Sequence, residues 1–242
     1  MAVFVTRPSQ DGEKTTQALR ARGFEVLASP TLRLEPLPFQ DDHGATYDAV
    51  IVTSANAVRA VKDDPALKPL LKLRLFAVGD ASAEVAGQIG FANVVSASGD
   101  GAALRDLVCA TLRKGSTLCY LAGADLGRDL TVELGEHGYT VITHTTYRMM
   151  PVLNFPAEVT AAFNSNGIEA TLHYSRRSAR AFVEAVQASG IEILALALPQ
   201  VCISQAVASI LREAGASRVI VAQTPDENAI FEALDRTLGV EH

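Results

Sequence analysis

The chain has 242 residues and a formal net charge of −6 at neutral pH; 48% of its residues are hydrophobic and 20% are charged. This composition is ordinary for a globular protein and leaves room for one large α/β domain or two small ones. The negative balance argues against a nucleic-acid partner, because phosphate binding relies on clustered Lys and Arg.

The sequence carries no signal for export or membrane insertion. The opening residues, MAVFVTRPSQ, lack a basic stretch followed by a long apolar run. The longest apolar run, 193–198, ends at Pro199 and is too short to cross a bilayer. Three scattered cysteines, at 109, 119 and 202, fit neither a disulfide framework nor a paired-cysteine metal site. We therefore expect a cytoplasmic protein with no membrane partner.

In chain order, short β-branched runs alternate with Ala- and Leu-rich helical stretches. Strands are predicted at 3–5, 50–52 and 219–221, where the apolar residues are continuous and do not alternate with polar ones. Such runs are typical of parallel strands that helices cover on both faces. The chain is therefore predicted to be an α/β protein built from βαβ units.

The sequence also repeats itself in four blocks that keep the same order. Chance could produce one such pair, but four ordered pairs indicate two copies of one unit of about five strands, the size of a flavodoxin-like sheet. The paired segments are 19–26 with 134–141, 49–60 with 170–181, 79–97 with 204–222, and 100–103 with 226–229.

Two extended, proline-ended stretches leave the domain boundaries open. TLRLEPLP at 31–38 and ITHTTYRMMP at 142–151 have no helical period. If they are linker strands lying side by side, the opening βαβ unit belongs with the last part of the chain. The alternative is two contiguous halves divided near Gly115. Repetition alone does not separate these arrangements.

The ordered landmarks of the whole chain resemble those of the uroporphyrinogen-III synthase family. No single motif is very specific, but their order and spacing together are. They are VTRP at 5–8, Gly23, Pro30, YDAVIVTSANAV at 47–58, AVGDASAEVAGQIG at 77–90, Gly123, Arg128 before Leu130, Tyr147, HYSRRSA at 173–179 and AQTP at 222–225.

The resemblance implies two similar flavodoxin-like parallel-sheet domains joined by a two-stranded β linker. One domain would be discontinuous, comprising 1–33 and 152–242, the other would comprise 39–145, and the linker strands would be 34–38 and 146–151. It further implies an enzyme, a lyase without metal or organic cofactor, that cyclises hydroxymethylbilane with inversion of ring D and loss of water. This linear tetrapyrrole carries eight carboxylates, and we expect a monomer to act on it.

Candidate substrate-binding residues follow the predicted strands. Parallel α/β sheets bind ligands beyond the carboxyl ends of their strands, where helix N-termini offer free N–H groups and a positive dipole. A cleft between two domains lined by such ends would hold a polycarboxylate despite the negative net charge. The alternative is that Ser54, Ser82 and Ser175 are merely N-caps. The candidates at these turns are Thr53, Ser54, Ala55, Gly79, Ser82, Ser175, Ser204 and Ala206.

Arginines are the second group of candidates, because a guanidinium binds a carboxylate through two hydrogen bonds. Arg7 and Arg176 directly follow strands and are the favoured anchors, while Arg128 follows Gly123. Arg59 and Arg180 lie deeper in their helices, where solvated side chains or ion pairs are expected.

Tyr147 is the one candidate for a chemical role. The resemblance places it where a phenol could assist departure of the substrate hydroxyl; the alternative is a tyrosine that braces the linker. The pyrrole releases electrons itself, so we expect Tyr147→Phe to slow the reaction modestly. In the second repeat the usual threonine is replaced by Val207, which excludes a side-chain hydrogen bond there.

Other chemistries find no support in the sequence. The histidines have no Cys or carboxylate at metal-ligand spacing, and no dinucleotide, P-loop or GxSxG motif is present. A non-catalytic, two-lobed ligand-binding or regulatory module is the remaining alternative to an enzyme, because it would keep the scaffold and the anion-binding turns.

Overall fold

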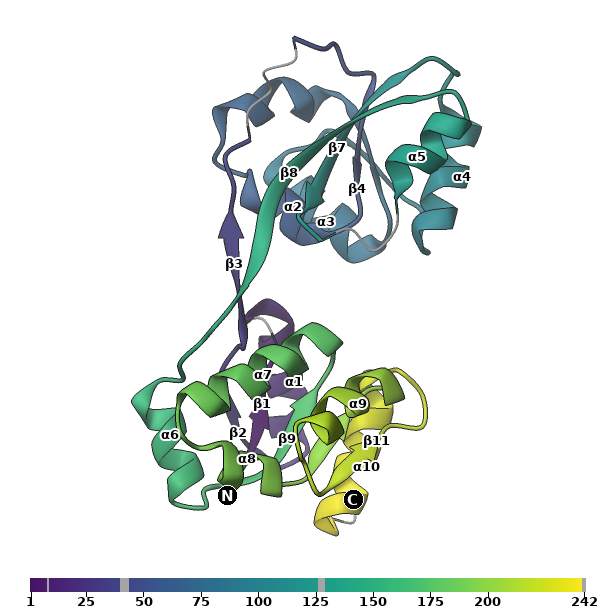
Figure 1. The fold of residues 1–242 in the computed structure, drawn as a ribbon. Coiled ribbons are helices and arrows are strands. Elements are labelled where there is room, and N and C mark those ends of the chain that lie inside the picture. Colours follow the sequence, from purple (N-terminus) through teal and green to yellow (C-terminus); the bar gives the residue numbers. More distant parts are fainter. Residues whose placement is uncertain (8, 40–43, 126–128, 241–242) are drawn as a thin grey trace. The chain divides into compact units, whose positions relative to one another are not determined.

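The computed structural model describes residues 1–242 apart from 8, 40–43, 126–128 and 241–242 (Figure 1). Its contacts divide the chain into two units. Unit 1 comprises Met1–Arg33 and Met150–His242, and unit 2 comprises Leu34–Met149. Each unit is an α/β structure around its own parallel sheet, which confirms the predicted fold class.

The sheet of unit 1 joins the beginning of the chain to its last part. Its strands lie in the order β11-β10-β9-β1-β2, and every pair is parallel. Because β1 pairs with β9, a division into two contiguous halves is excluded. Counted along the chain within the unit, the order is that of flavodoxin. The strands are β1 (Ala2–Val5), β2 (Glu25–Ala28), β9 (Ile168–His173), β10 (Gln200–Cys202) and β11 (Val219–Val221).

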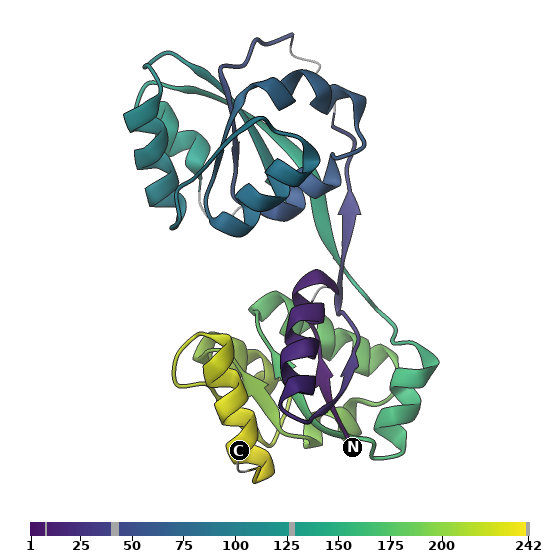
Figure 2. The ribbon, with the colours of Figure 1, turned by 180° about the vertical axis from the view of Figure 1, so that it is seen from behind.

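Helices cover both faces of this sheet, as Figures 1 and 2 show from opposite sides. Successive side chains of β1 point to opposite faces: Phe4 packs toward one set of helices, Val3 and Val5 toward the other. The Phe4 face carries α6 (Ala157–Asn164), α7 (Arg176–Ala188), α8 (Glu192–Ala197) and α9 (Gln205–Glu213), and the other carries α1 (Ser9–Ala21) and α10 (Glu227–Leu238).

The sheet of unit 2 repeats this order with one further strand. Its order is β3-β8-β7-β4-β5-β6, so β6-β5-β4-β7-β8 corresponds to β11-β10-β9-β1-β2 of unit 1. The same sheet is thus built twice with different chain starts. The strands are β3 (Leu32–Pro36), β4 (Ala49–Val52), β5 (Arg74–Ala77), β6 (Asn93–Ser96), β7 (Thr117–Gly123) and β8 (Thr140–Pro151).

Two apolar clusters cover the faces of the unit 2 sheet as well. One includes Val50 and Val52 of β4, and the other includes Ala49 and Ile51. The first packs under α2 (Ala55–Ala60), the 3-10 helix η1 (Pro65–Lys72) and α3 (Asp80–Ile89), and the second under α4 (Gly101–Thr111) and α5 (Leu130–Glu136).

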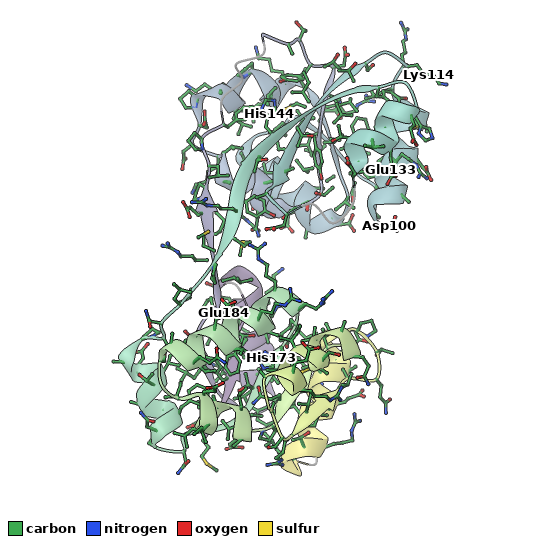
Figure 3. The ribbon with its side chains drawn as sticks, in the orientation of Figure 1. Asp100, Lys114, Glu133, His144, His173 and Glu184 are labelled. Atoms are coloured by element: carbon green, nitrogen blue, oxygen red, sulfur yellow. The ribbon has the colours of Figure 1, made fainter. Side chains whose placement is uncertain are left out.

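The sequence repeats correspond to local structural requirements. Gly23 and Gly138 adopt left-handed backbone conformations, with φ of 85° and 91°, which a side chain would disfavour. Asp100 and Asp226 cap α4 and α10 by accepting hydrogen bonds from backbone N–H groups of the first turn; Figure 3 labels Asp100 at its helix end. The repeats therefore preserve the residues that end and begin the helices.

Two cysteines of the strands lie in the cores of their units. Cys119 of β7 and Cys202 of β10 are fully buried, as expected for core residues, and burial raises the pKa of the Cys202 thiol to about 12. Within the described residues, no helix has the length and apolar character needed to span a bilayer.

Candidate functional site

The topology of unit 1 places a ligand-binding crevice between β1 and β9. There the chain connections leave in opposite directions at the carboxyl edge of the parallel sheet. Arg7 follows β1, and Ser175 and Arg176 follow β9. Ser204 and Ala206 follow the next strand, β10. The unit 1 candidates therefore gather at one edge.

Arg7 already holds a carboxylate of its own chain. Its Nη1 atom donates to Glu227 Oε1 at 3.0 Å and to Thr15 Oγ1 at 3.3 Å. The Thr15 hydroxyl donates to the same Glu227 oxygen at 2.6 Å, and the guanidinium lies 4.3 Å from the centre of the Tyr174 ring. Only 24% of the Arg7 side chain is exposed. The geometry at Arg7 is therefore suited to a carboxylate.

Tyr174 belongs to this cluster and was missed from the sequence. Burial raises the pKa of its phenol well above the usual value; Glu227 raises it further, while Arg7 and Thr15 lower it. The phenol is thus neutral at physiological pH. One signal could have found it: in the repeat alignment Tyr174 occupies the position of Thr53, which was a candidate.

The helix starts that follow β9 and β10 differ in how they are capped. Ser175 is the N-cap of α7 and accepts from Ser178 N at 3.0 Å. Ser204 is the N-cap of α9, but its side chain makes no cap hydrogen bond. Arg176 and Ala206 are exposed, and Arg176 has no ion pair with any residue that the structure describes. Arg176 is therefore available to an external anion.

The matching crevice of unit 2 lies between β4 and β7. Thr53 follows β4, Ser54 is the N-cap of α2 and accepts from Asn56 N at 3.2 Å, and Ala55 begins the helix. The alternative that Ser54 and Ser175 are capping residues is therefore confirmed, although capping leaves both at the edge where ligands bind.

Ser82 does not cap a helix, so that expectation was wrong. Gly79 is the N-cap of α3, in an extended conformation, and no side chain caps it. Ser82 lies one turn inside the helix and is only 7% exposed. The hydroxyl after the glycine resembled a cap in sequence, but the helix begins at Asp80, which carries Ser82 toward the core.

Tyr147 lies in β8, and its ring packs against Gly123, the last residue of β7. Gly123 pairs with Tyr147 across β7 and β8, and an added Cβ at Gly123 would lie 2.6 Å from Tyr147 Cζ and 2.8 Å from its hydroxyl oxygen. The ring is partly buried against the α2 and α3 side of the core. Its hydroxyl has no hydrogen bond to any described residue. It can therefore donate to a ligand.

Tyr120 is a second tyrosine of this edge that the sequence analysis missed. It is almost fully buried in β7, and its hydroxyl lies 3.0 Å from Thr53 Oγ1. Burial raises the pKa of the phenol, the hydrogen bond with Thr53 lowers it, and the nearby Tyr147 and Asp129 raise it. A tyrosine inside an otherwise apolar strand was the available signal, since its hydroxyl needs a partner.

Arg128 lies outside the described residues, so its predicted role stays a prediction. Among the residues that are described, no cluster of three or more His, Cys, Asp or Glu side chains could hold a metal ion. His173 and His144, labelled in Figure 3, are buried within their own units and engaged with Gln200 and Tyr47 respectively.

The comparisons with known proteins identify the family. Residues 13–232 match the family model described as uroporphyrinogen-III synthase HemD. The chain belongs to the uroporphyrinogen-III synthase family. It is therefore an enzyme of tetrapyrrole biosynthesis with a small tetrapyrrole as substrate, and a non-catalytic binding module is not favoured.

Solved structures with the same fold include two synthases. Uroporphyrinogen-III synthetase from Helicobacter pylori matches with a TM-score of 0.65 and 18% identity, over 98% of this chain and 99% of that one. A mutant uroporphyrinogen III synthase from the extremely thermophilic bacterium Thermus thermophilus matches with a TM-score of 0.56 and 17% identity, over 100% of both chains. No curated protein matches the chain.

Proposed function

We propose that this family member is a lyase that cyclises hydroxymethylbilane to uroporphyrinogen III, inverting ring D and releasing water. The observation that carries the proposal is the family match, which extends over residues 13–232. The described candidates that directly follow strands support it, among them Arg7, Thr53 and Ser175, because they lie at the carboxyl edges of the sheets, where parallel α/β sheets bind ligands.

Carboxylate binding is proposed for the helix starts and arginines of these edges. At Gly79 and Ser204 no side chain caps the helix. Ser82 N and Val207 N donate to the carbonyls of Gly79 and Ser204, so the N–H groups of the first two residues of α3 and α9 are the ones proposed to bind an anion, which the helix dipole stabilises. Arg176 adds an exposed guanidinium at the start of α7. Ser54, Ala55 and Ser175 contribute through the backbone of their turns.

Tyr147 is proposed as the hydrogen-bond donor to the departing hydroxyl group. Proton donation lets the oxygen leave as water, and the pyrrole nitrogen supplies the electron pair, which gives an azafulvene protonated on nitrogen. The ring D carbon that already carries the methylene bridge attacks this electrophile and gives a spiro intermediate. The bond from that carbon to the bridge then breaks and re-forms at the free α-carbon of ring D, which inverts the ring, and loss of the proton from this carbon restores the pyrrole. Much of the acceleration would come from holding the flexible tetrapyrrole in a curled conformation. The phenol then contributes modestly.

The test is to supply enzymatically generated hydroxymethylbilane and to separate the isomers of the product. Excess type III isomer over the spontaneous background supports the proposal. Type I product alone, at the rate of the enzyme-free control, would contradict it.

We further propose that the enzyme is a cytoplasmic monomer that uses no cofactor. Light scattering and activity after exhaustive chelation test the monomer and the missing metal requirement.

A further inference from the structure

A groove of about 340 Å³ runs along α1 in unit 1. Gly12, Thr16 and Arg20 line it from successive turns of the helix, and Ala28 and Pro30 line it from the end of β2. Gly12 to Arg20 spans about 12 Å at the helical rise of 1.5 Å per residue. The groove is therefore elongated, with its length set by two turns of α1.

An arginine lines each end of the groove, and the guanidinium of Arg7 is already paired with Glu227. Arg7 lines one end and Arg20 the other, with Glu13 as the acidic side chain among the lining residues. Arg20 is exposed and makes no ion pair or hydrogen bond with a described residue. A ligand with an acidic group at the Arg20 end therefore fits the groove better than a neutral or cationic one.

The wall between the arginines is polar only in part. Gly12, Ala28 and Pro30 offer no side-chain hydrogen-bonding group, while Gln17 offers an amide. The hydroxyl of Thr16 is buried without a hydrogen-bond partner, although Thr residues in helices commonly donate to a carbonyl of the preceding turn. The groove thus combines apolar contact in the middle with hydrogen-bond donors at the ends.

The position of the groove indicates which ligand carries the acidic groups. Arg7 lies at the β1 end of the sheet edge, beside the crevice to β9, and it also lines the groove. A ligand bound at the crevice and long enough to follow α1 can reach Arg20. The linear substrate and the cyclic product both bear carboxylated side chains on all four pyrrole rings, so one molecule of either reaches both places.

From this geometry we propose that the groove between α1 and β2 binds carboxylate side chains of the tetrapyrrole, with Arg20 as their anchor. The proposal rests on the proposed synthase function and extends it to a face of unit 1 that the sequence did not indicate. Arg20 acts in binding alone, since it lies two helical turns from the strand edge.

The test titrates the full-length chain with uroporphyrinogen III under anaerobic conditions and follows the backbone amide resonances of α1. Arg20→Gln should raise Kd, and KM for hydroxymethylbilane, about three- to tenfold at low salt, with kcat unchanged. Glu13→Gln should lower Kd about twofold by removing a repulsive charge. Lys14→Gln is the matched control: it removes one positive charge from the same helix outside the groove and should change Kd less than twofold.

A second titration with succinate tests whether the groove binds any small dicarboxylate or only the carboxylate side chains of a tetrapyrrole. Shifts in α1 with uroporphyrinogen III that Arg20→Gln weakens support the proposal. Shifts with succinate alone, shifts with neither, or equal effects of Arg20→Gln and Lys14→Gln overturn it. These outcomes are distinct from failure of the proposed function, which would appear as type I product from the unmodified chain.

Discussion

Gly123→Ala is the sharpest perturbation of the Tyr147 site. The new methyl group would lie 2.6 Å from Tyr147 Cζ, 2.8 Å from its hydroxyl oxygen and 2.9 Å from Cε1. Pairing across β7 and β8 fixes the backbone, including the bond from Ala124 N to Tyr147 O at 2.9 Å. The ring must therefore move by at least about 0.8 Å to restore the ordinary 3.4 Å contact.

This displacement predicts both a loss of stability and a loss of rate. Overpacking of this kind costs about 1–3 kcal/mol, and each kcal/mol lowers Tm by about 2–4 °C in a protein of this size. A phenol moved by ~1 Å loses its alignment with the leaving oxygen. Tyr147→Phe removes one hydrogen bond to the leaving oxygen, worth about 1.4 kcal/mol or about tenfold in kcat, and Gly123→Ala should lower kcat to the same level.

The assay measures initial rates of type III product and thermal unfolding for Gly123→Ala, Tyr147→Phe and the double variant. The double variant should have the kcat of Tyr147→Phe, because the displaced group is already absent. Gly135→Ala is the control: nothing lies within 4 Å of its added Cβ, so it should keep full activity. A further tenfold loss in the double variant, or unchanged kcat and Tm in Gly123→Ala, would refute the argument. Complete inactivity of folded Tyr147→Phe would refute a modest role for the phenol.

Three further predictions follow from single contacts. Tyr120→Phe removes the 3.0 Å hydrogen bond to Thr53. Chemical denaturation should show a free energy of unfolding lower by about 1 kcal/mol, and KM should rise more than kcat falls. An unchanged KM would contradict a positioning role for Tyr120. Arg176→Gln should raise KM about three- to tenfold and reduce its dependence on salt, which steady-state kinetics at two ionic strengths would check. Burial lowers the pKa of His173 to about 4, from 6.5. The unfolded chain therefore binds the proton first as the pH falls. The contribution of His173 to the free energy of unfolding should be fully present above pH 6.5 and fall by about 3 kcal/mol as the pH drops to 4. In urea unfolding, the free energy of unfolding of His173→Gln should depend less on pH across this range.

The fold could be predicted because the residues that begin and end its helices are recognisable within short stretches of sequence. Gly23 and Gly138 had to be glycines at left-handed positions, and Asp100 and Asp226 had to begin helices, so duplication left a visible pattern. The residue limits of the domains, the role of the linker strands and the functions of the site residues stay predictions.

The partners within the site could not be predicted, because they lie far apart in sequence. Tyr120 and Thr53 are separated by 67 positions, and Arg7 and Glu227 by 220. No local pattern marks either pair; only the sheet order brings them together. The expected capping role of Ser82 was wrong for a different reason. The helix begins three residues earlier, with Gly79 as its N-cap, and this places Ser82 in the core.

The pairing of β3 with β8 has a consequence for how the chain folds. These strands begin and end the segment Leu34–Met149, and they are joined by the bond from Leu37 N to Thr146 O and by the Glu35–Arg148 ion pair. Once this segment has folded, the flanking pieces of chain emerge next to each other. Closing an unstructured loop of that length would cost about 4 kcal/mol by its logarithmic dependence on size. We therefore expect unit 2 to fold first and to bring β1 close to β9. A substitution that destabilises unit 2 would then slow the folding of unit 1, although no residue in the core of unit 1 is changed.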